Sequence, residues 1–225
     1  MSGREAILNK VRGALGVSFG DASRASAVAR RLDDAPVGVV PARGQLPESD
    51  RIALFCAMAL KVSASVDRVK GPGEVPEAVA AYLRSKNLPA SVRMGADERL
   101  QAMPWKAVPA LEVKSGPAGA EDEVGVSHAI AGVAETGTVV LHSGAANPTT
   151  VNFLPEHHIV VVDAKEIAGD LETVFSRIRH RFGKGTMPRT VNLITGPSRS
   201  GDIEQKLLLG AHGPRALHLI VVDAG

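Results

Sequence analysis

The residues best suited to binding chemistry form a loop near the C-terminus, Thr195-Gly-Pro-Ser-Arg-Ser-Gly-Asp-Ile-Glu204. It follows an apolar run over residues 191–195 that predicts a buried strand, and a helix is expected to begin near Asp202. Open α/β sheets bind their ligands at such strand ends. Glycines allow a close approach of the backbone, and hydroxyl and guanidinium groups donate hydrogen bonds to anions. The candidate ligand-binding residues are Gly196, Ser198, Arg199, Ser200, Asp202 and Glu204.

Two interpretations of this loop stay open. It binds an anion, or Asp202 and Gln205 form a capping box and the polar groups only close the start of the helix. The segment is not a P-loop, because the Lys-Ser/Thr ending is missing, and its glycine spacing does not match a dinucleotide fingerprint.

The turn Glu135-Thr136-Gly137-Thr138 is the second candidate. It lies between apolar runs at 129–134 and 138–141, which predicts a hairpin. Glu135 either caps backbone donors or projects into a cleft, and its pKa should rise if it is buried, as a general base or nucleophile requires. Spacing alone favours a structural turn. Glu135 is the candidate catalytic residue, and Thr136, Gly137 and Thr138 are candidate ligand-binding residues.

The histidines show no metal-binding pattern. Adjacent His157 and His158 must point to opposite faces of an extended chain, so they would not easily chelate one metal ion. His158 is expected to hold a backbone carbonyl at the start of a strand. His212, in Gly210-Ala-His-Gly-Pro214, is a candidate ligand-binding residue, although a turn-stabilising role is the favoured interpretation. We predict no metal site.

The surrounding elements alternate between strand and helix patterns. Short apolar runs predict strands at 65–69, 91–94, 159–162, 191–195 and 217–222, and the last three are expected to be buried. Helical patterns cover 48–61, 75–86 and 171–182. This rhythm predicts an α/β fold with a mainly parallel sheet flanked by helices. Residues 101–123 receive no assignment.

The N-terminal residues predict a separate helical arm over 1–32, with a second helix capped by Asp21. A Pro- and Gly-rich linker or loop is expected at 33–48, and a single α/β domain at 49–225. The arm is basic: six Lys and Arg side chains face two acidic ones in the first 31 residues. A solvated helix face is the favoured interpretation, with an acidic protein or an anionic membrane surface as alternatives. We predict no nucleic-acid partner.

Cysteine content and hydropathy exclude several classes of protein. Cys56 is the only cysteine, so this chain can form no internal disulfide and no cysteine-bound zinc or iron–sulfur site. No apolar stretch approaches the roughly 20 residues of a membrane span, and the N-terminus lacks an apolar signal core. We therefore predict a cytoplasmic protein.

Three motifs in order resemble the LUD domain of the lactate utilization protein C family: residues 131–141, residues 152–162, and residues 196–204 with 209–214. The resemblance is dense over 124–223. It implies a fold similar to the NagB/RpiA/CoA-transferase-like class in a bacterial protein. It also implies a role beside two iron–sulfur proteins in oxidising L-lactate to pyruvate. Ser200 and Gly201 stand where Thr and Ala are usual in the family.

Since this chain lacks cluster cysteines, the resemblance makes it the cluster-free subunit, with no redox cofactor of its own and with iron–sulfur clusters in its partner proteins. The alternative is a stand-alone enzyme or binding protein for a phosphorylated sugar or an acyl-CoA ester. Glu135 would then act as base or nucleophile, and the 196–202 loop would hold the small anionic ligand. A regulatory binding module is a third hypothesis.

Overall fold

The computed structural model describes residues 2–201 and 207–223, which form two units, Met1–Val39 and Val40–Gly225. The first unit contains helices α1 (Gly3–Ala14) and α2 (Ala22–Asp34). Ser2 and Glu5 form a capping box at the start of α1. As predicted, Asp21 caps α2, and its side chain accepts hydrogen bonds from the backbone N–H groups of Ser23 and Arg24.

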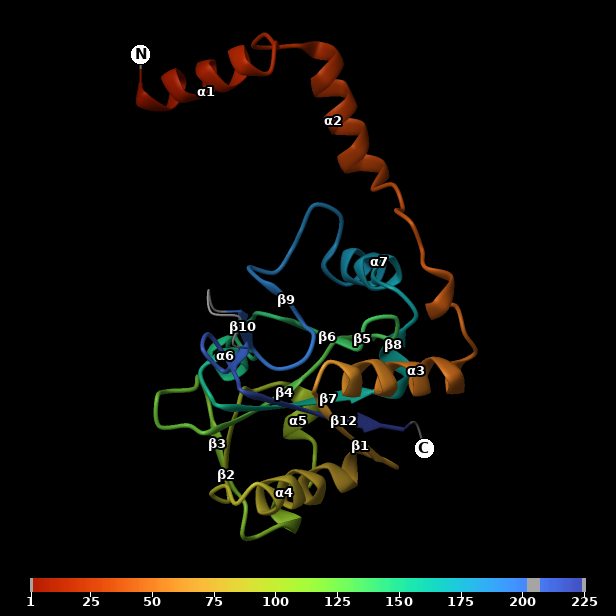
Figure 1. The fold of residues 1–225 in the computed structure, drawn as a ribbon, viewed down its shortest axis with the longest axis vertical. Helices are drawn as coiled ribbons and strands as arrows, with labels where there is room; N and C mark the ends of the chain where they lie inside the picture. Colours follow the sequence, from red (N-terminus) through yellow and green to blue (C-terminus); the bar gives the residue numbers. More distant parts are fainter. Residues whose placement is uncertain (1, 202–206, 224–225) are drawn as a thin grey trace. The chain divides into compact units, whose positions relative to one another are not determined.

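The second unit is built on a six-stranded parallel sheet, which confirms the predicted fold class (Figure 1). Its strand order is β1-β12-β7-β4-β2-β3, and every neighbouring pair is parallel. The strands are β1 (Ser65–Val69), β2 (Ser91–Met94), β3 (Glu112–Ser115), β4 (Val124–His128), β7 (His157–Asp163) and β12 (Ala216–Val222). The carboxyl ends of β2, β4 and β7 therefore meet at one edge of the sheet.

Helices cover both faces of this sheet because its strands are apolar on both sides. Helix α4 (Val75–Ser85) packs on one face, where its Val79 meets a cluster containing Ile159. Helix α3 (Glu48–Lys61) packs on the other, where Phe55 meets a cluster containing Val160. The alternation extends to the histidines of β7: His157 bonds Tyr82 of α4, and His158 lies on the opposite face, as predicted.

A second sheet lies beyond α3, in the order β8-β5-β6-β9. It comprises β5 (Ala131–Val133), β6 (Thr138–His142), β8 (Ile167–Ala168) and β9 (Val191–Ile194). β5 and β6 form the predicted hairpin around Glu135. Helix α7 (Leu171–Phe182) covers this sheet through Val174 and Ile178. β9 was predicted to be buried, and this is wrong: it is an edge strand with Leu193 45% exposed.

The segment before β12 differs from the expectation. β10 (Arg199–Gly201) pairs antiparallel with β11 (Leu207–Leu209). The helix predicted to follow Asp202 is therefore wrong at 207–209, where the chain is a strand. The rest of that prediction, including Asp202, Glu204 and the capping partner Gln205, lies outside the described residues.

The remaining elements are short. They are α5 (Glu98–Gln101), α6 (Thr150–Phe153) and the 3-10 turns η1 (Ala42–Gly44), η2 (Pro72–Glu74), η3 (Trp105–Ala107) and η4 (Ala164–Glu166). The unassigned stretch 101–123 contains η3 and the edge strand β3. Within the described residues, none of the helices has the length and apolarity that a bilayer crossing requires.

Part of the stretch predicted as a linker is fixed to the second unit. Gly44 is buried, and a Cβ at this position would collide with the carbonyl oxygen of Gly169. The side-chain amide of Gln45 donates to Asp170 Oδ2 at 2.9 Å. Residues 42–46 therefore pack beside the start of α7.

Candidate functional site

A cavity of about 240 Å³ opens where the C-terminal loop, the turn before β12 and the start of β7 meet. The motifs at 152–162, 196–204 and 209–214 each contribute to its wall. The predicted residues in the wall are Gly196, Ser198 and His212, and they are joined by Asn152, Phe153, His158, Leu193, Ile194, Thr195, Pro197, Gly213, Pro214 and Leu217. Segments up to 65 residues apart in the sequence, Asn152 and Leu217, thus line one small space.

Backbone hydrogen bonds hold the two loops of the wall together. The Ser198 N–H donates to the Pro214 carbonyl at 2.8 Å, and the Gly210 N–H donates to the Ser198 carbonyl at 3.0 Å. His212 lies in the turn enclosed by these two bonds. This turn is where the sequence placed it, and its imidazole is exposed at the cavity wall.

The Glu135 turn is coupled to the cavity through hydroxyl groups. Thr136 Oγ1 and Thr138 Oγ1 lie 2.7 Å apart, and Thr138 Oγ1 lies 2.7 Å from Thr195 Oγ1. Thr195 lines the cavity. The predicted residues Thr136 and Thr138 therefore support the wall from behind.

Two glycines of these motifs pack against the C-terminal end of α3. Gly137 and Gly196 have φ of +67° and +76°, which few other residues adopt without strain. A Cβ at Gly137 would collide with the backbone nitrogen of Ala59, and one at Gly196 with the carbonyl oxygen of Val62. Glycine at both positions lets the turn and the loop approach the helix closely.

Glu135 itself lies at the start of α7. The residue is 5% exposed, Oε1 accepts from the Leu171 N–H at 3.3 Å, and Oε2 lies 4.0 Å from Arg43 Nε. Negative charge at a helix N-terminus is favourable because the free N–H groups there carry positive partial charge. This position matches the structural-turn interpretation of Glu135.

Arg199, like Glu135, makes structural hydrogen bonds to another part of the chain. Its Nη2 donates at 2.6 Å to both the Val62 carbonyl and Ser63 Oγ, at the end of α3. A cation at a helix C-terminus is favourable, and here it ties the C-terminal loop to α3. Ser200 lies in β10 opposite Leu208.

His158 is the most deeply buried polar residue of the cavity wall, at 1% exposed. Its Nε2 lies 3.0 Å from Ser127 Oγ, and that hydroxyl donates to Asn152 Oδ1 at 2.7 Å. The prediction that His158 holds a backbone carbonyl is therefore wrong, since its partner is a serine hydroxyl. Burial lowers the pKa of His158 to about 3, so the ring is neutral at physiological pH.

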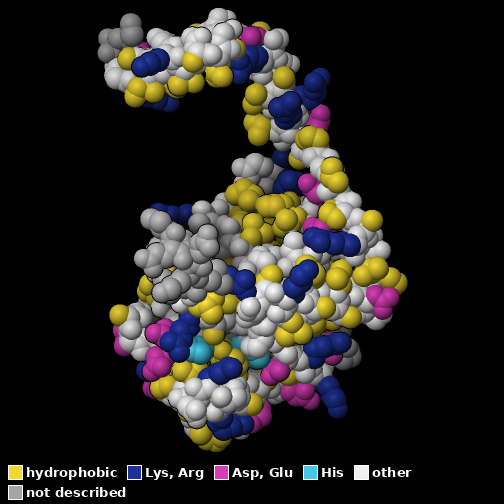
Figure 2. All heavy atoms as spheres, viewed as in Figure 1, with side chains coloured by type: hydrophobic (Ala, Val, Ile, Leu, Met, Phe, Trp, Pro, Cys, Tyr) yellow, Lys and Arg dark blue, Asp and Glu magenta, His cyan; other side chains and the backbone are white. Residues whose placement is uncertain are grey.

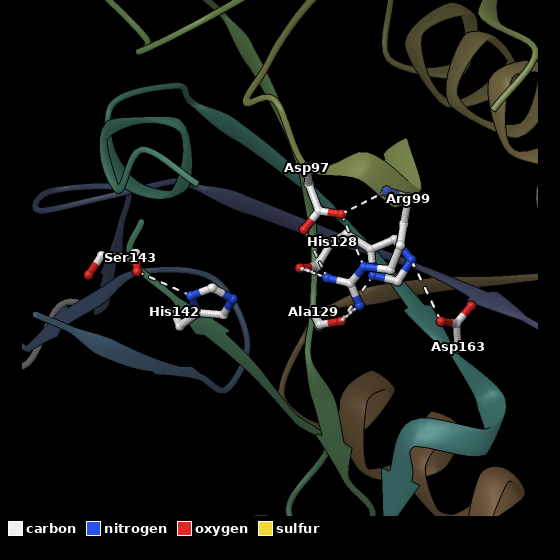
Figure 3. Close-up of polar contacts among 7 residues, drawn as sticks. All are labelled: Asp97, Arg99, His128, Ala129, His142, Ser143 and Asp163. Atoms are coloured by element: carbon white, nitrogen blue, oxygen red, sulfur yellow. Dashed lines mark hydrogen bonds and ion pairs between the residues drawn. The ribbon is translucent and has the colours of Figure 1, made fainter. Parts of the chain in front are cut away.

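A second polar cluster lies at the carboxyl edge of the parallel sheet (Figure 3). Arg99 donates to both carboxylate oxygens of Asp97 and to the Ala129 carbonyl. His128 Nδ1 donates to that same carbonyl at 2.9 Å, and its Nε2 lies 3.9 Å from Asp163 Oδ2. Burial raises the pKa of Asp97, but the hydrogen bonds and charge of Arg99 outweigh it, so the pKa is lowered.

This cluster was not predicted from the sequence, although Asp97 and Asp163 each follow a predicted strand. Burial first, and then the Arg99 charge, lower the pKa of His128. The adjacent void measures about 10 Å³, room for one water molecule. The cluster therefore closes the sheet edge, whereas the cavity beside His158 has room for a ligand. Across the described residues, histidine, cysteine and carboxylate groups nowhere gather in the threes that a metal ion would need.

Comparison with known families decides the classification. The family model of the LUD domain matches residues 52–222, which include the whole cavity wall and the sheet-edge cluster. The chain belongs to the LUD domain family. The match confirms the resemblance drawn from the three motifs. It leaves out the first unit, residues 1–39.

Among curated proteins, this LUD domain chain is similar to lactate utilization protein C of Geobacillus sp. strain WCH70. The two are 39% identical over 102 residues, 44% of this chain and 42% of the relative. Lactate utilization protein C of Bacillus subtilis strain 168 is 38% identical over 102 residues, again 44% and 42%. The uncharacterized protein YkgG of Escherichia coli K12 is 32% identical over 136 residues, 58% of each chain. The matches span about half the length of these relatives.

A solved structure supports the fold of this LUD domain. The crystal structure of a DUF162 family protein from Deinococcus radiodurans aligns with a TM-score of 0.56 over 79% of this chain and 99% of that one. The sequence identity is 23%, so the likeness concerns the fold.

Proposed function

We propose that this LUD domain protein serves lactate utilization as the cluster-free subunit of an L-lactate-oxidising complex. The observation that carries the proposal is its similarity to proteins named lactate utilization protein C. Oxidation of L-lactate to pyruvate releases two electrons and two protons. In the proposed complex the electrons pass to iron–sulfur clusters held by partner proteins.

The cysteine content of this chain supports the proposal that partner proteins hold the iron–sulfur clusters. An iron–sulfur cluster is ordinarily held by four cysteine thiolates, and this chain has one cysteine. Cys56 is half-buried in α3, where burial raises the pKa of its thiol and so disfavours the thiolate that ligates iron.

The cavity suits a small polar metabolite. Its volume of about 240 Å³ is below the range of pockets that hold drug-sized ligands. The polar residues Thr195, Ser198 and His212 share the wall with the apolar side chains of Ile194 and Leu217. Such a wall can bind the hydroxyl and the methyl group of a small 2-hydroxy acid at the same time.

The first unit offers a surface for docking on an acidic partner. Figure 2 shows hydrophobic side chains along α1 and α2, interleaved with basic ones. Ile7, Leu15 and Phe19 are 66, 62 and 83% exposed. The first 31 residues carry six basic side chains and two acidic ones, so a partner surface with an apolar groove and an acidic rim is complementary to them. We assign this surface to an iron–sulfur partner of the complex.

Growth on L-lactate tests the proposed function. Deleting the gene should abolish growth on L-lactate as sole carbon source while growth on pyruvate persists, and a plasmid copy should restore it. Normal growth on L-lactate, in a strain without another lactate dehydrogenase, would refute the proposal. Activity of the isolated chain on sugar phosphates or CoA esters, lost in Glu135→Gln while the stability of the chain is unchanged, would instead support the stand-alone enzyme.

The docking surface has its own test. A tagged wild-type chain should co-purify with iron-containing proteins, and the double variant Ile7→Ser/Leu15→Ser should lose them. The matched control is Val39→Ser, because Val39 is 92% exposed but lies outside both helices. Equal iron recovery with the double variant and the control would rule out docking through this face.

A further inference from the structure

An open groove of about 500 Å³ follows one flank of helix α7, where the helix meets the start of β5. Its volume lies within the range of about 300–1,000 Å³ that is usual for small-molecule sites. The buried residues of its lining are all aliphatic: Ile130, Ala131, Val174 and Ile178. Among the described residues, no aromatic side chain lines the groove, so a planar ring finds nothing to stack on. This floor suits an aliphatic chain.

The rim of the groove is polar and carries Glu166, Ser176, Arg177, His180 and Arg181. Arg177 Nη1 donates to the Glu166 carbonyl at 3.2 Å and lies 3.5 Å from Glu166 Oε2, so these two charges offset each other. Arg181 is exposed and makes no hydrogen bond or ion pair with another described residue. The rim therefore carries a positive charge that no described carboxylate neutralises.

The chain around the groove adds to this positive charge. Residues 173–200 contain six Lys and Arg side chains and no Asp or Glu, so their field attracts anions and repels cations. The free carbonyl groups at the end of α7 carry about half a negative charge. Arg179 and Arg181 lie in that last turn, and their charge exceeds this amount. An anionic group is therefore favoured at the rim.

We propose that this groove binds a small anionic amphiphile, an aliphatic chain that ends in one carboxylate or phosphate group. The aliphatic chain lies on Ile130, Val174 and Ile178, and the anionic group binds the guanidinium of Arg181. This guanidinium ends a long, exposed side chain that no described partner holds away from a bound anion. The groove shares no lining residue with the cavity beside His158, and the inference does not rest on the proposed function.

Titration calorimetry of the purified full chain with hexanoate, octanoate and decanoate tests the proposal. Binding should tighten with chain length, by up to about fourfold for each methylene that the groove buries. Octanol has the chain of octanoate without the charge, and it should bind at least about threefold more weakly than octanoate. Equal affinity for hexanoate and decanoate, or for octanol and octanoate, would overturn the inference. So would the absence of saturable decanoate binding at concentrations on the order of 1 mM.

Reversing the charge of Arg181 tests the contact with the anionic group. Arg181→Glu should weaken decanoate binding about tenfold, because a repulsion replaces an attraction. The matched control is Arg189→Glu, which makes the same change in net charge at an exposed arginine outside the groove. It should stay within about twofold of the wild type, because salt screens charges at a distance. Equal losses of affinity in the two variants would contradict the assignment of Arg181.

Methyl NMR of the wild-type chain locates the ligand without relying on a variant that folds. Decanoate should shift the methyl signals of Ile130 and Ile178, which line the groove, and leave the signal of Ile7 in α1 unchanged. Shifts at Ile7 alone would place the amphiphile on the exposed first unit and overturn the inference. Phosphatidylglycerol vesicles separate a membrane surface from a free amphiphile. A chain that sediments with these vesicles but does not bind free decanoate would also overturn it.

Discussion

Stability of the second unit should fall when the pH drops from 8 to 5. Burial lowers the pKa of His158 to about 3. Burial also lowers that of His218 to about 4, although the nearby carboxylate of Asp67 opposes this shift. In the unfolded chain both rings return to an ordinary pKa of about 6.5. Between the two values the unfolded state binds more protons than the folded state, so stability is lost as the pH falls through this window.

The magnitude follows from the two pKa values of each ring. At pH 5 the unfolded ring is about 97% protonated and the folded ring is almost entirely neutral, which costs about 2 kcal/mol for each histidine. The two together lower the free energy of unfolding by about 4 kcal/mol relative to pH 8, a large part of an ordinary domain's 5–15 kcal/mol. Burial lowers the pKa of His128 and His157 as well, so both act in the same direction.

Urea unfolding at pH 8 and pH 5 measures this difference. His158→Leu should remove about 2 kcal/mol of the pH-dependent loss, because leucine binds no proton in either state. The control is His180→Gln, at an exposed histidine, and it should change the loss by less than about 0.5 kcal/mol. Equal stability at pH 5 and pH 8, or an undiminished loss in His158→Leu, would refute the assignment of neutral buried rings.

Three substitutions test the packing that supports the cavity. Gly137→Ala should lower the free energy of unfolding, measured in urea, by about 2 kcal/mol or more, because the new Cβ would collide with the backbone of α3 at a residue with positive φ. The control is Gly185→Ala, where φ is also positive but a Cβ meets no neighbouring atom, and it should lower the free energy of unfolding by only about 1 kcal/mol. Asp170→Ala removes the side chain that caps α7 by accepting from the Thr173 N–H at 2.8 Å. It should lower the free energy of unfolding by about 1 kcal/mol in the same assay. Thr138→Val interrupts the hydroxyl chain and should lower the thermal midpoint by an amount equivalent to about 1 kcal/mol, whereas an unchanged midpoint would make the chain energetically irrelevant.

The parallel sheet could be read from the sequence because its strands are bounded apolar runs. β1 and β2 have the predicted bounds, as does helix α3. β4 was missed, although all five of its residues are buried, since Gly125, Ser127 and His128 break its apolar pattern. β9 shows the opposite error. Its sequence Val191–Ile194 resembles that of a central strand. It is an edge strand because it pairs with β6 on one side and with no described strand of this sheet on the other.

The candidate loops were found from the sequence, but the roles of their charged residues were not. Glu135 bonds the backbone of Leu171, 36 positions later, and Arg199 bonds the backbone of Val62, 137 positions earlier. No local pattern reveals partners at such separations. The link between Ser127 and His158 is equally invisible, because it joins neighbouring strands β4 and β7 across 31 positions.

The end of α3 connects these separate motifs into one site. Gly137 and Gly196 both pack on it, and Arg199 binds the Val62 carbonyl and the Ser63 hydroxyl that follow its last residue. The Glu135 turn and the C-terminal loop are thus positioned by the same helix end, and Thr138 and Thr195 then join them directly. A substitution in the Glu135 turn therefore reaches the cavity wall through Thr195. For that reason, loss of ligand binding in a variant of this turn would not by itself make Glu135 a catalytic residue. Measuring stability separates the two cases. If the defect is structural, the free energy of unfolding falls together with ligand binding.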